Sequence, residues 1–149
     1  MKLTKDQKEK LENLLPALDN SKLKKALKRA IKTWETEEYG KGLWGVIVQD
    51  GKVCMNPSYH QPACCLLGAA ILNVKTKKDY EIRYPSVWAV TGFSMREVDI
   101  VVSTFDNGIK SAWIIYKSEE LSSSEKELIT EVLKIREILF DDERNELNW

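Results

Sequence analysis

The 149-residue chain has the length of one domain and can bury a sizeable core without disulfides or metals. Its composition is typical of a globular protein, with 43% hydrophobic and 31% charged residues. Basic and acidic residues number 23 each, so the formal net charge is zero. This balance removes the overall positive field that usually accompanies nucleic-acid binding and leaves only local patches to consider. We therefore expect a single domain over residues 1–149.

The start of the chain and its cysteines favour the cytoplasm. Residues 1–8 contain no apolar segment of the kind found in signal peptides, and no stretch approaches the length of a membrane span. Three cysteines is an odd number, and Cys64 and Cys65 are adjacent, which makes a poor framework for disulfides. We expect a cytoplasmic protein with no membrane segment.

Two helices are predicted before residue 35. Thr4 and Gln7 have the spacing of a capping box, ahead of a helix that Pro16 ends or kinks. Asn20 or Ser21 caps the next helix. Its apolar residues recur at helical spacing and are Leu23, Leu27, Ala30, Ile31 and Trp34. A short turn between the two helices predicts an antiparallel helical hairpin.

The polar face of the second helix is basic. It carries Lys22, Lys24, Lys25, Lys28, Arg29 and Lys32, with no acid among them. A phosphate-contacting patch fits this pattern, and so does a solvated face that pairs with acids elsewhere, since residues 119–149 hold ten acids and four bases. Without interleaved aromatic residues, nucleic-acid binding is the disfavoured alternative. We take Lys24, Lys25, Lys28 and Arg29 as a candidate binding surface.

A β-hairpin and a buried helix are predicted in the middle of the chain. The segment 43–49 is rich in strand formers, Asp50-Gly51 is a strong hairpin turn, and residues 52–55 form the return strand. Residues 62–72 hold no charged side chain, which predicts a helix buried on all faces. Proline suits the first turn of this helix, which would also contain Cys64.

Two further helices complete the prediction. Ser94 and Glu97 form a second capping box, followed by an apolar stripe and a turn at residues 106–108. The stripe consists of Val98, Val101, Val102 and Phe105. A long C-terminal helix begins at one of the serines 122–124 and leaves residues 141–149 as a frayed tail. The resulting fold class is α+β and mainly helical, with an N-terminal helical hairpin, one β-hairpin, a buried central helix and a long C-terminal helix.

The cysteine segment, which we define as Cys54, His60, Cys64 and Cys65, is the candidate for chemistry. Zinc favours thiolate and imidazole ligands, so Cys54, His60 and Cys64 or Cys65 form one hypothetical metal site. Their spacing matches none of the usual zinc patterns, which use cysteine pairs two to four residues apart. Adjacent cysteines also rarely bind one ion together.

A nucleophilic cysteine is the other chemical hypothesis. Cys64 in the first turn of a helix would favour the thiolate, with His60 as base and Asp106 or Asn107 orienting it. Papain-type proteases place the histidine after the cysteine, and here no histidine follows Cys65. Free cysteines are often buried and pack as small apolar residues, so we favour a structural role. We expect neither a cofactor nor a metal.

Several short motifs occur in a particular order between residues 30 and 110. They are Trp34, residues 38–40, 43–53 and 64–68, the segment 91–94, and the turn 105–108. In this order they resemble a set of small uncharacterised proteins from bacteriophages and bacterial genomes. The chain departs from that pattern by an extra leucine between the paired cysteines and Gly68, and by Asp106-Asn107 where the family has Asn-Asp. The resemblance implies a common compact fold and a phage or mobile-element setting, and it implies no activity.

These patterns predict a small phage or mobile-element accessory protein that binds another macromolecule, for example as an inhibitor of a host factor, and they favour this role over an enzymatic one. Trp44 and Trp113 are candidates for an interface, because aromatic side chains often anchor one, whereas Trp34 and Trp88 are expected in the core. A protein partner is expected, and a homodimer through the C-terminal helix is a further hypothesis. The alternative function is a cysteine-dependent enzyme or zinc protein that uses the cysteine segment.

Overall fold

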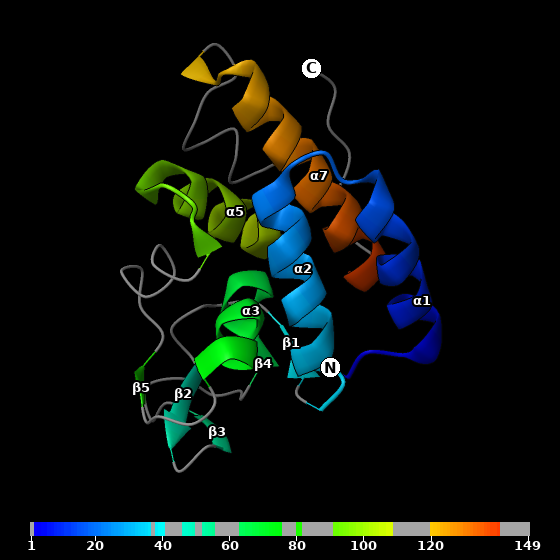
Figure 1. Cartoon of the computed structure of the whole chain (residues 1–149), viewed down its shortest axis with the longest axis vertical. Helices are drawn as coiled ribbons and strands as arrows, with labels where there is room; N and C mark the ends of the chain where they lie inside the picture. Colours follow the sequence, from blue (N-terminus) through cyan, green and yellow to red (C-terminus); the bar gives the residue numbers. More distant parts are fainter. Residues whose placement is uncertain are drawn as a thin grey trace.

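The computed structural model describes residues 2–36, 38–40, 46–49, 52–55, 63–75, 80–81, 91–108 and 120–140 (Figure 1). Its helices are α1 (Lys5–Leu14), the short 3-10 helix η1 (Leu15–Ala17), α2 (Ser21–Trp34), α3 (Leu66–Lys75), α5 (Met95–Asn107) and α7 (Ser123–Leu139). Its strands are β1 (Glu38–Tyr39), β2 (Val46–Gln49), β3 (Lys52–Met55), β4 (Ala63–Cys64) and β5 (Tyr80–Glu81). The expected mainly helical character is confirmed.

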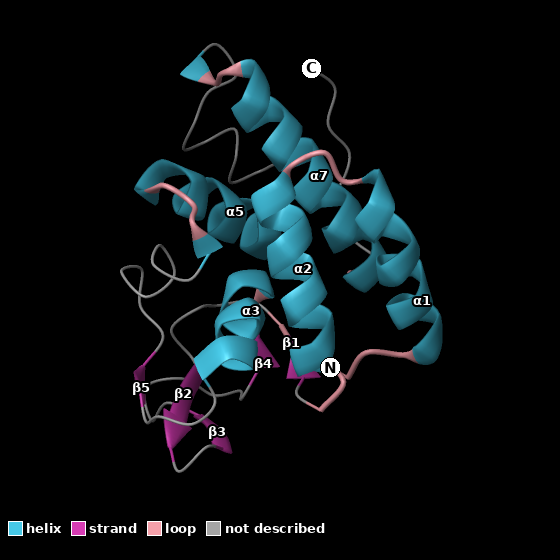
Figure 2. Cartoon of the chain, viewed as in Figure 1, coloured by secondary structure: helices cyan, strands magenta, loops and turns pink. Residues whose placement is uncertain are grey.

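The strands are short and gather at one end of the molecule (Figure 2). β2 pairs antiparallel with β3, with Gln49 opposite Lys52, and it also pairs antiparallel with β5. β1 and β4 form a separate parallel pair. The predicted turn residues Asp50 and Gly51 lie outside the described residues. Because none of these strands exceeds four residues, helices build most of the described structure.

Four of the described helices begin with a side-chain cap that is set by residues close in sequence. Thr4, Ser94 and Ser122 each accept the N–H of the residue three positions further on, whose side chain bonds back to the cap. Asn20 caps α2 by accepting the N–H of Leu23 at 2.9 Å. These bonds satisfy N–H groups that the start of a helix otherwise leaves without partners. The predicted caps at Thr4, Asn20 and Ser94 are confirmed, as is the helix start at the serines 122–124.

The central helix begins later than predicted. Ala63 and Cys64 form β4 and pair in parallel with Glu38 and Tyr39, and α3 starts at Leu66. The prediction of a helix with Cys64 in its first turn is therefore wrong, because pairing with a distant segment overrides the local preference. Residues 65–70 are buried, in agreement with a core helix.

Helix α2 lies between α1 and α5 in Figure 1 and packs most extensively on α3. It runs opposite to α1, to which it is joined through η1. All the residues of its predicted apolar stripe are buried. The hydroxyl of Thr33 donates to the carbonyl oxygen of Ala69, so a buried polar contact also joins α2 to α3.

An aromatic cluster joins the C-terminal ends of α2, α5 and α7. Trp34 stacks on Phe105 with ring centroids 6.3 Å apart, and Phe105 meets Phe140 edge to face at 5.6 Å. Arg136 is fully buried beside them, with its guanidinium 5.3 Å from the centre of the Phe140 ring. Its Nε donates to the Phe105 carbonyl at 2.9 Å. That carbonyl belongs to the last turn of α5, where a cation suits the negative end of the helix.

Helix α7 packs its apolar face against the rest of the chain. Between Leu128 and Leu139, every large apolar side chain except the half-buried Ile138 is buried. Tyr39 closes the end of the helix by donating its hydroxyl to the Leu139 carbonyl at 3.1 Å. The predicted homodimer through this helix therefore has no exposed apolar stripe to use in residues 123–139. None of the helices in the described ranges is long and apolar enough to cross a membrane.

Candidate functional site

The geometry of the cysteine segment is described only in part. Cys54 and Cys64 lie in β3 and β4, but their side chains, and all of His60, fall outside the described residues. Asp106 is half-buried in the last turn of α5. The zinc and nucleophile hypotheses therefore stay predictions, and the argument from a helical position of Cys64 no longer supports the second.

Cys65, and not Cys64, occupies the start of α3. Its carbonyl accepts the N–H of Ala69 at 2.8 Å, and its sulfur accepts the N–H of Gly68 at 3.3 Å. The residue is only 1% exposed. A buried sulfur that caps a helix has a structural reason to be there, in line with the structural role that the sequence favoured for the cysteines.

The structure describes some of the residues that the sequence suggested for an interface or for the core, but not all of them. Trp44 and Trp113 lie outside the described residues, as does Trp88. Trp34 is 1% exposed, so its predicted place in the core is confirmed. The described candidates that remain are the basic residues of α2.

The basic residues of α2 lie opposite its buried face. We define the basic face as Lys22, Lys24, Lys25, Lys28, Arg29 and Lys32; the lysines are exposed and Arg29 is half-buried. Helical periodicity explains this separation, because the apolar stripe and the bases occupy opposite sides of a repeat of 3.6 residues. Lys24, Lys28 and Lys32 form a row with one residue per turn. A regular helix thus fixes the backbone positions from which these side chains extend.

The centre of the basic face does not help α2 to form. Its first turn contains Lys22 and no acidic residue, although the N-terminal end of a helix favours negative charge. Lys24 and Lys28 are four residues apart, as are Lys28 and Lys32, and like charges at this spacing repel by a few tenths of a kcal/mol, about 0.2–0.5 per pair. Lys32 in the last turn suits the negative end of the helix, but the charges of Lys24, Lys25 and Lys28 have no evident role in stabilising it.

An acid lies close to each end of the basic face. Lys22 Nζ lies 3.3 Å from Glu97 Oε1 on α5. Burial would raise the pKa of Glu97, but hydrogen bonds from Ser94 and Lys22 outweigh burial and lower that pKa. At the other end, Lys8 lies 2.8 Å from Glu35 and holds the pKa of that carboxyl below its usual value, with a smaller contribution from Lys32.

The centre of the basic face has no such balance. Within the part of the chain that the structure describes, no acid lies within ion-pair distance of Lys24, Lys25 or Lys28. These three side chains are exposed and lie within about two turns of one helix. They form a local concentration of positive charge on a chain whose net charge is zero.

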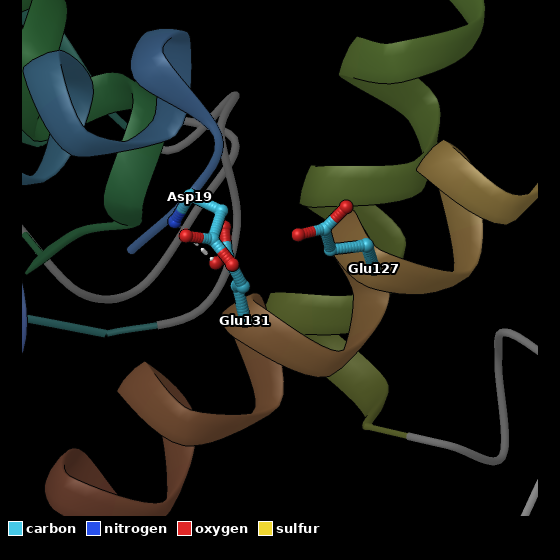
Figure 3. A group of neighbouring side chains, drawn as sticks. All are labelled: Asp19, Glu127 and Glu131. Carbon is cyan, nitrogen blue, oxygen red and sulfur yellow. Dashed lines mark hydrogen bonds between the residues drawn. The ribbon is translucent and has the colours of Figure 1, made fainter. Parts of the chain in front are cut away.

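A group of three carboxylates lies beside the N-terminal end of α2 (Figure 3). Asp19, Glu127 and Glu131 each place one carboxylate oxygen within 4.8 Å of the other two. Glu131 is 3% exposed and accepts the backbone N–H of Asp19 at 2.7 Å and that of Asn20 at 3.0 Å. It thereby fixes the segment before α2 to α7, and so sets where the basic face begins.

Carboxylate oxygens this close together are also the ligands that hard cations prefer. The hydrogen bonds of Glu131 already explain its burial, however, and Asp19 and Glu127 are exposed. The pKa of Glu127 is raised, chiefly by its hydrogen-bonding contact with the Asp19 carboxyl. We assign the group an anchoring role and no ion.

The carboxylates border a polar hollow of about 290 Å³ between α2, α5 and α7. The hollow is lined by Asp19, Asn20, Ser21, Lys22, Glu97, Ser124 and Glu127. No spacing pattern in the sequence pointed to the group of Asp19, Glu127 and Glu131. One signal was available, because Glu131 interrupts the apolar stripe of α7, and an acid at such a position needs hydrogen-bond donors.

Comparisons of the chain with protein-family models, with curated proteins and with solved structures found no match. The function is therefore inferred from the described surface and from the sequence.

Proposed function

We propose that this chain is a small cytoplasmic accessory protein of phage or mobile-element type that acts by binding another protein. Its docking surface is the basic face of α2, and inhibition of a host factor is the task that suits such a setting. The phage or mobile-element setting is supported by the resemblance in motif order. In fold class we propose α+β, with the hairpin of β2 and β3 as its small β element.

The single observation that supports binding is the unbalanced centre of the basic face. Lys24, Lys25 and Lys28 are exposed, have no acidic partner among the described residues, and repel one another. Proteins tolerate such small losses of stability where a function requires them. A charged face on a rigid helix also gives a partner a fixed pattern to recognise.

A protein partner is favoured over a nucleic acid by the overall charge. The chain has equal numbers of acids and bases, so it lacks the long-range field that draws a protein to nucleic acid. Five of the six bases of the face are lysines, which act as point charges and lack the planar fork with which arginine grips a phosphate.

The proposal is tested by affinity capture with a charge-reversed protein. In the variant Lys24→Glu/Lys25→Glu/Lys28→Glu, which we call the α2 variant, the centre of the face becomes acidic. Purified wild type and α2 variant are immobilised and exposed to nuclease-treated bacterial lysate, and bound proteins are quantified by mass spectrometry. We expect one or more proteins to bind the wild type and to be lost from the α2 variant.

A matched control changes the same amount of charge elsewhere. Lys5 and Lys10 are exposed residues of α1, and Lys2 is exposed just before it. Their replacement by glutamate gives the α1 control. The control should retain the proteins that bind the wild type. Equal capture by all three proteins would refute the proposed surface. Proteins that are captured from untreated lysate but not from nuclease-treated lysate were held by nucleic acid and not by this chain.

A further inference from the structure

We infer that the partner docks through a short acidic helix whose carboxylates meet Lys24, Lys25 and Lys28. This inference rests on the proposed function and specifies the chemistry of the partner. It follows from the short length of helix that carries these three lysines, from the acids near the two ends of α2, and from the spacing of the lysines.

The unbalanced part of the face is short. Lys22 is already paired with Glu97, and Lys32, which has no ion pair among the described residues, lies in the last turn of α2, three residues before the exposed Glu35. The lysines left between them span positions 24–28, a rise of about 6 Å along the helix axis. Such a site accommodates two or three carboxylates. A long array of negative charge would extend beyond it.

Acids lie beyond both ends of this site and disfavour an extended polyanion. Asp19 and Glu127 are exposed at the N-terminal end of α2, and Glu35 is exposed just after its C-terminal end. Duplex DNA carries about one negative charge per 1.7 Å, so a duplex aligned with α2 would bring phosphates close to these acids. Opposing like charges reduce affinity and select against a wrong partner. A short acidic protein segment avoids this repulsion.

The spacing of the lysines matches a helix. Lys25 and Lys28 are three residues apart and Lys24 and Lys28 are four apart, so their charges recur once per turn. Glutamates at positions i and i+4 of a partner helix recur with the same step, which lets each carboxylate approach one ammonium when the two helices lie side by side. A helix is also pre-organised and loses less conformational entropy on binding than a flexible segment.

The exposed surface also predicts how the affinity for the partner depends on salt. Among described residues, the large apolar side chain that is exposed is Met95, at the start of α5 and not on the basic face. Without an apolar anchor on this face, the contact depends on charge. Its affinity should fall steeply as salt shortens the range of electrostatic attraction, with a Debye length of about 10 Å at 0.1 M.

Three labelled probes test the inference by fluorescence anisotropy with the full-length protein. The first is an alanine-rich helical peptide of about 15 residues with glutamates four residues apart on one face. The second has the same composition and helicity, but its glutamates are distributed around the helix. The third is a duplex DNA of about 20 base pairs. Each is titrated with wild type, the α2 variant and the α1 control, at low and at raised salt.

We expect the striped peptide to bind wild type and the α1 control about tenfold more tightly than the distributed peptide, a difference of about 1.4 kcal/mol. The α2 variant should lose this preference, and salt should weaken binding. Equal binding of the two peptides, tighter binding of the duplex, or no detectable binding of the striped peptide would overturn the inference. If α2-dependent capture from lysate still occurs, these results overturn the acidic helix alone; equal capture by wild type and variant overturns the proposed function.

Discussion

The two faces of helix α2 differ in whether their side chains find partners within the chain. On the inner face, Trp34 stacks on Phe105, and Thr33 bonds to a carbonyl of α3, so each group has a partner within the chain. On the outer face, Lys24 and Lys28 lie in water with no acid beside them among the described residues. The same fourteen-residue helix thus carries one face that the fold requires and one that it does not.

This difference separates folding from function. Substitutions on the inner face should reduce the free energy of unfolding, because they remove packing or hydrogen bonds. Substitutions in the centre of the outer face should leave stability almost unchanged and alter binding alone. If the outer face proved important for stability, its charges would have a structural explanation.

The largest effect is expected from Trp34→Ala. Trp34 is 1% exposed and lies in the aromatic cluster, so its removal leaves a large cavity and should cost about 3–5 kcal/mol of unfolding free energy. Urea denaturation gives this value. Lys28→Ala, in the same helix but exposed, is the comparison and should change stability by less than about 0.5 kcal/mol. Similar losses for the two variants would remove the distinction between the faces.

A smaller loss is expected from Glu131→Gln. The carboxylate accepts two backbone N–H groups, from Asp19 and Asn20, and an amide offers only one oxygen. One N–H would face the NH₂ group, which should cost about 2 kcal/mol. Relief of repulsion from the exposed Asp19 and Glu127 is smaller because water screens it. Glu137→Gln, exposed on the same helix, should have no measurable effect, and an unchanged stability for Glu131→Gln would contradict the anchoring role.

The smallest effect is expected from Glu127→Gln, and it should depend on pH. Because the folded protein raises the pKa of Glu127, folding favours the protonated form, and the associated stability is lost as pH rises through the folded pKa. The variant should therefore unfold at a slightly higher temperature than wild type at pH 7 and at the same temperature well below pH 4. In an Asp19→Asn background the gain should disappear, because the main cause of the raised pKa is gone. A pH-independent gain would contradict this assignment.

Local patterns predicted much of the helical structure. Capping residues such as Ser94 and Glu97 act over three positions, so their spacing alone indicated a helix start. The turn at Gly108, which has a φ of 65°, was also marked by residue type. The apolar stripe and the basic face of α2 both followed from helical periodicity, so the charged part of the candidate site was predicted from the sequence.

The features that sequence did not predict depend on contacts between distant segments. β1 and β4 are two residues long and have no periodicity of their own, so the late start of α3 could not be foreseen. Glu131 reaches backbone groups more than 100 residues away, and Glu97 balances Lys22 from another helix. Which lysines remain unbalanced, and hence the extent of the candidate site, therefore required the three-dimensional structure.

The central claim is that the middle of the basic face serves binding and not folding. The most direct test is the free energy of unfolding of Lys24→Gln/Lys25→Gln/Lys28→Gln, measured by urea denaturation beside wild type. Removing three mutually repelling charges should leave stability within about 0.5 kcal/mol of wild type or raise it slightly. A loss of about 2 kcal/mol or more would show that the fold depends on these lysines and would contradict the claim.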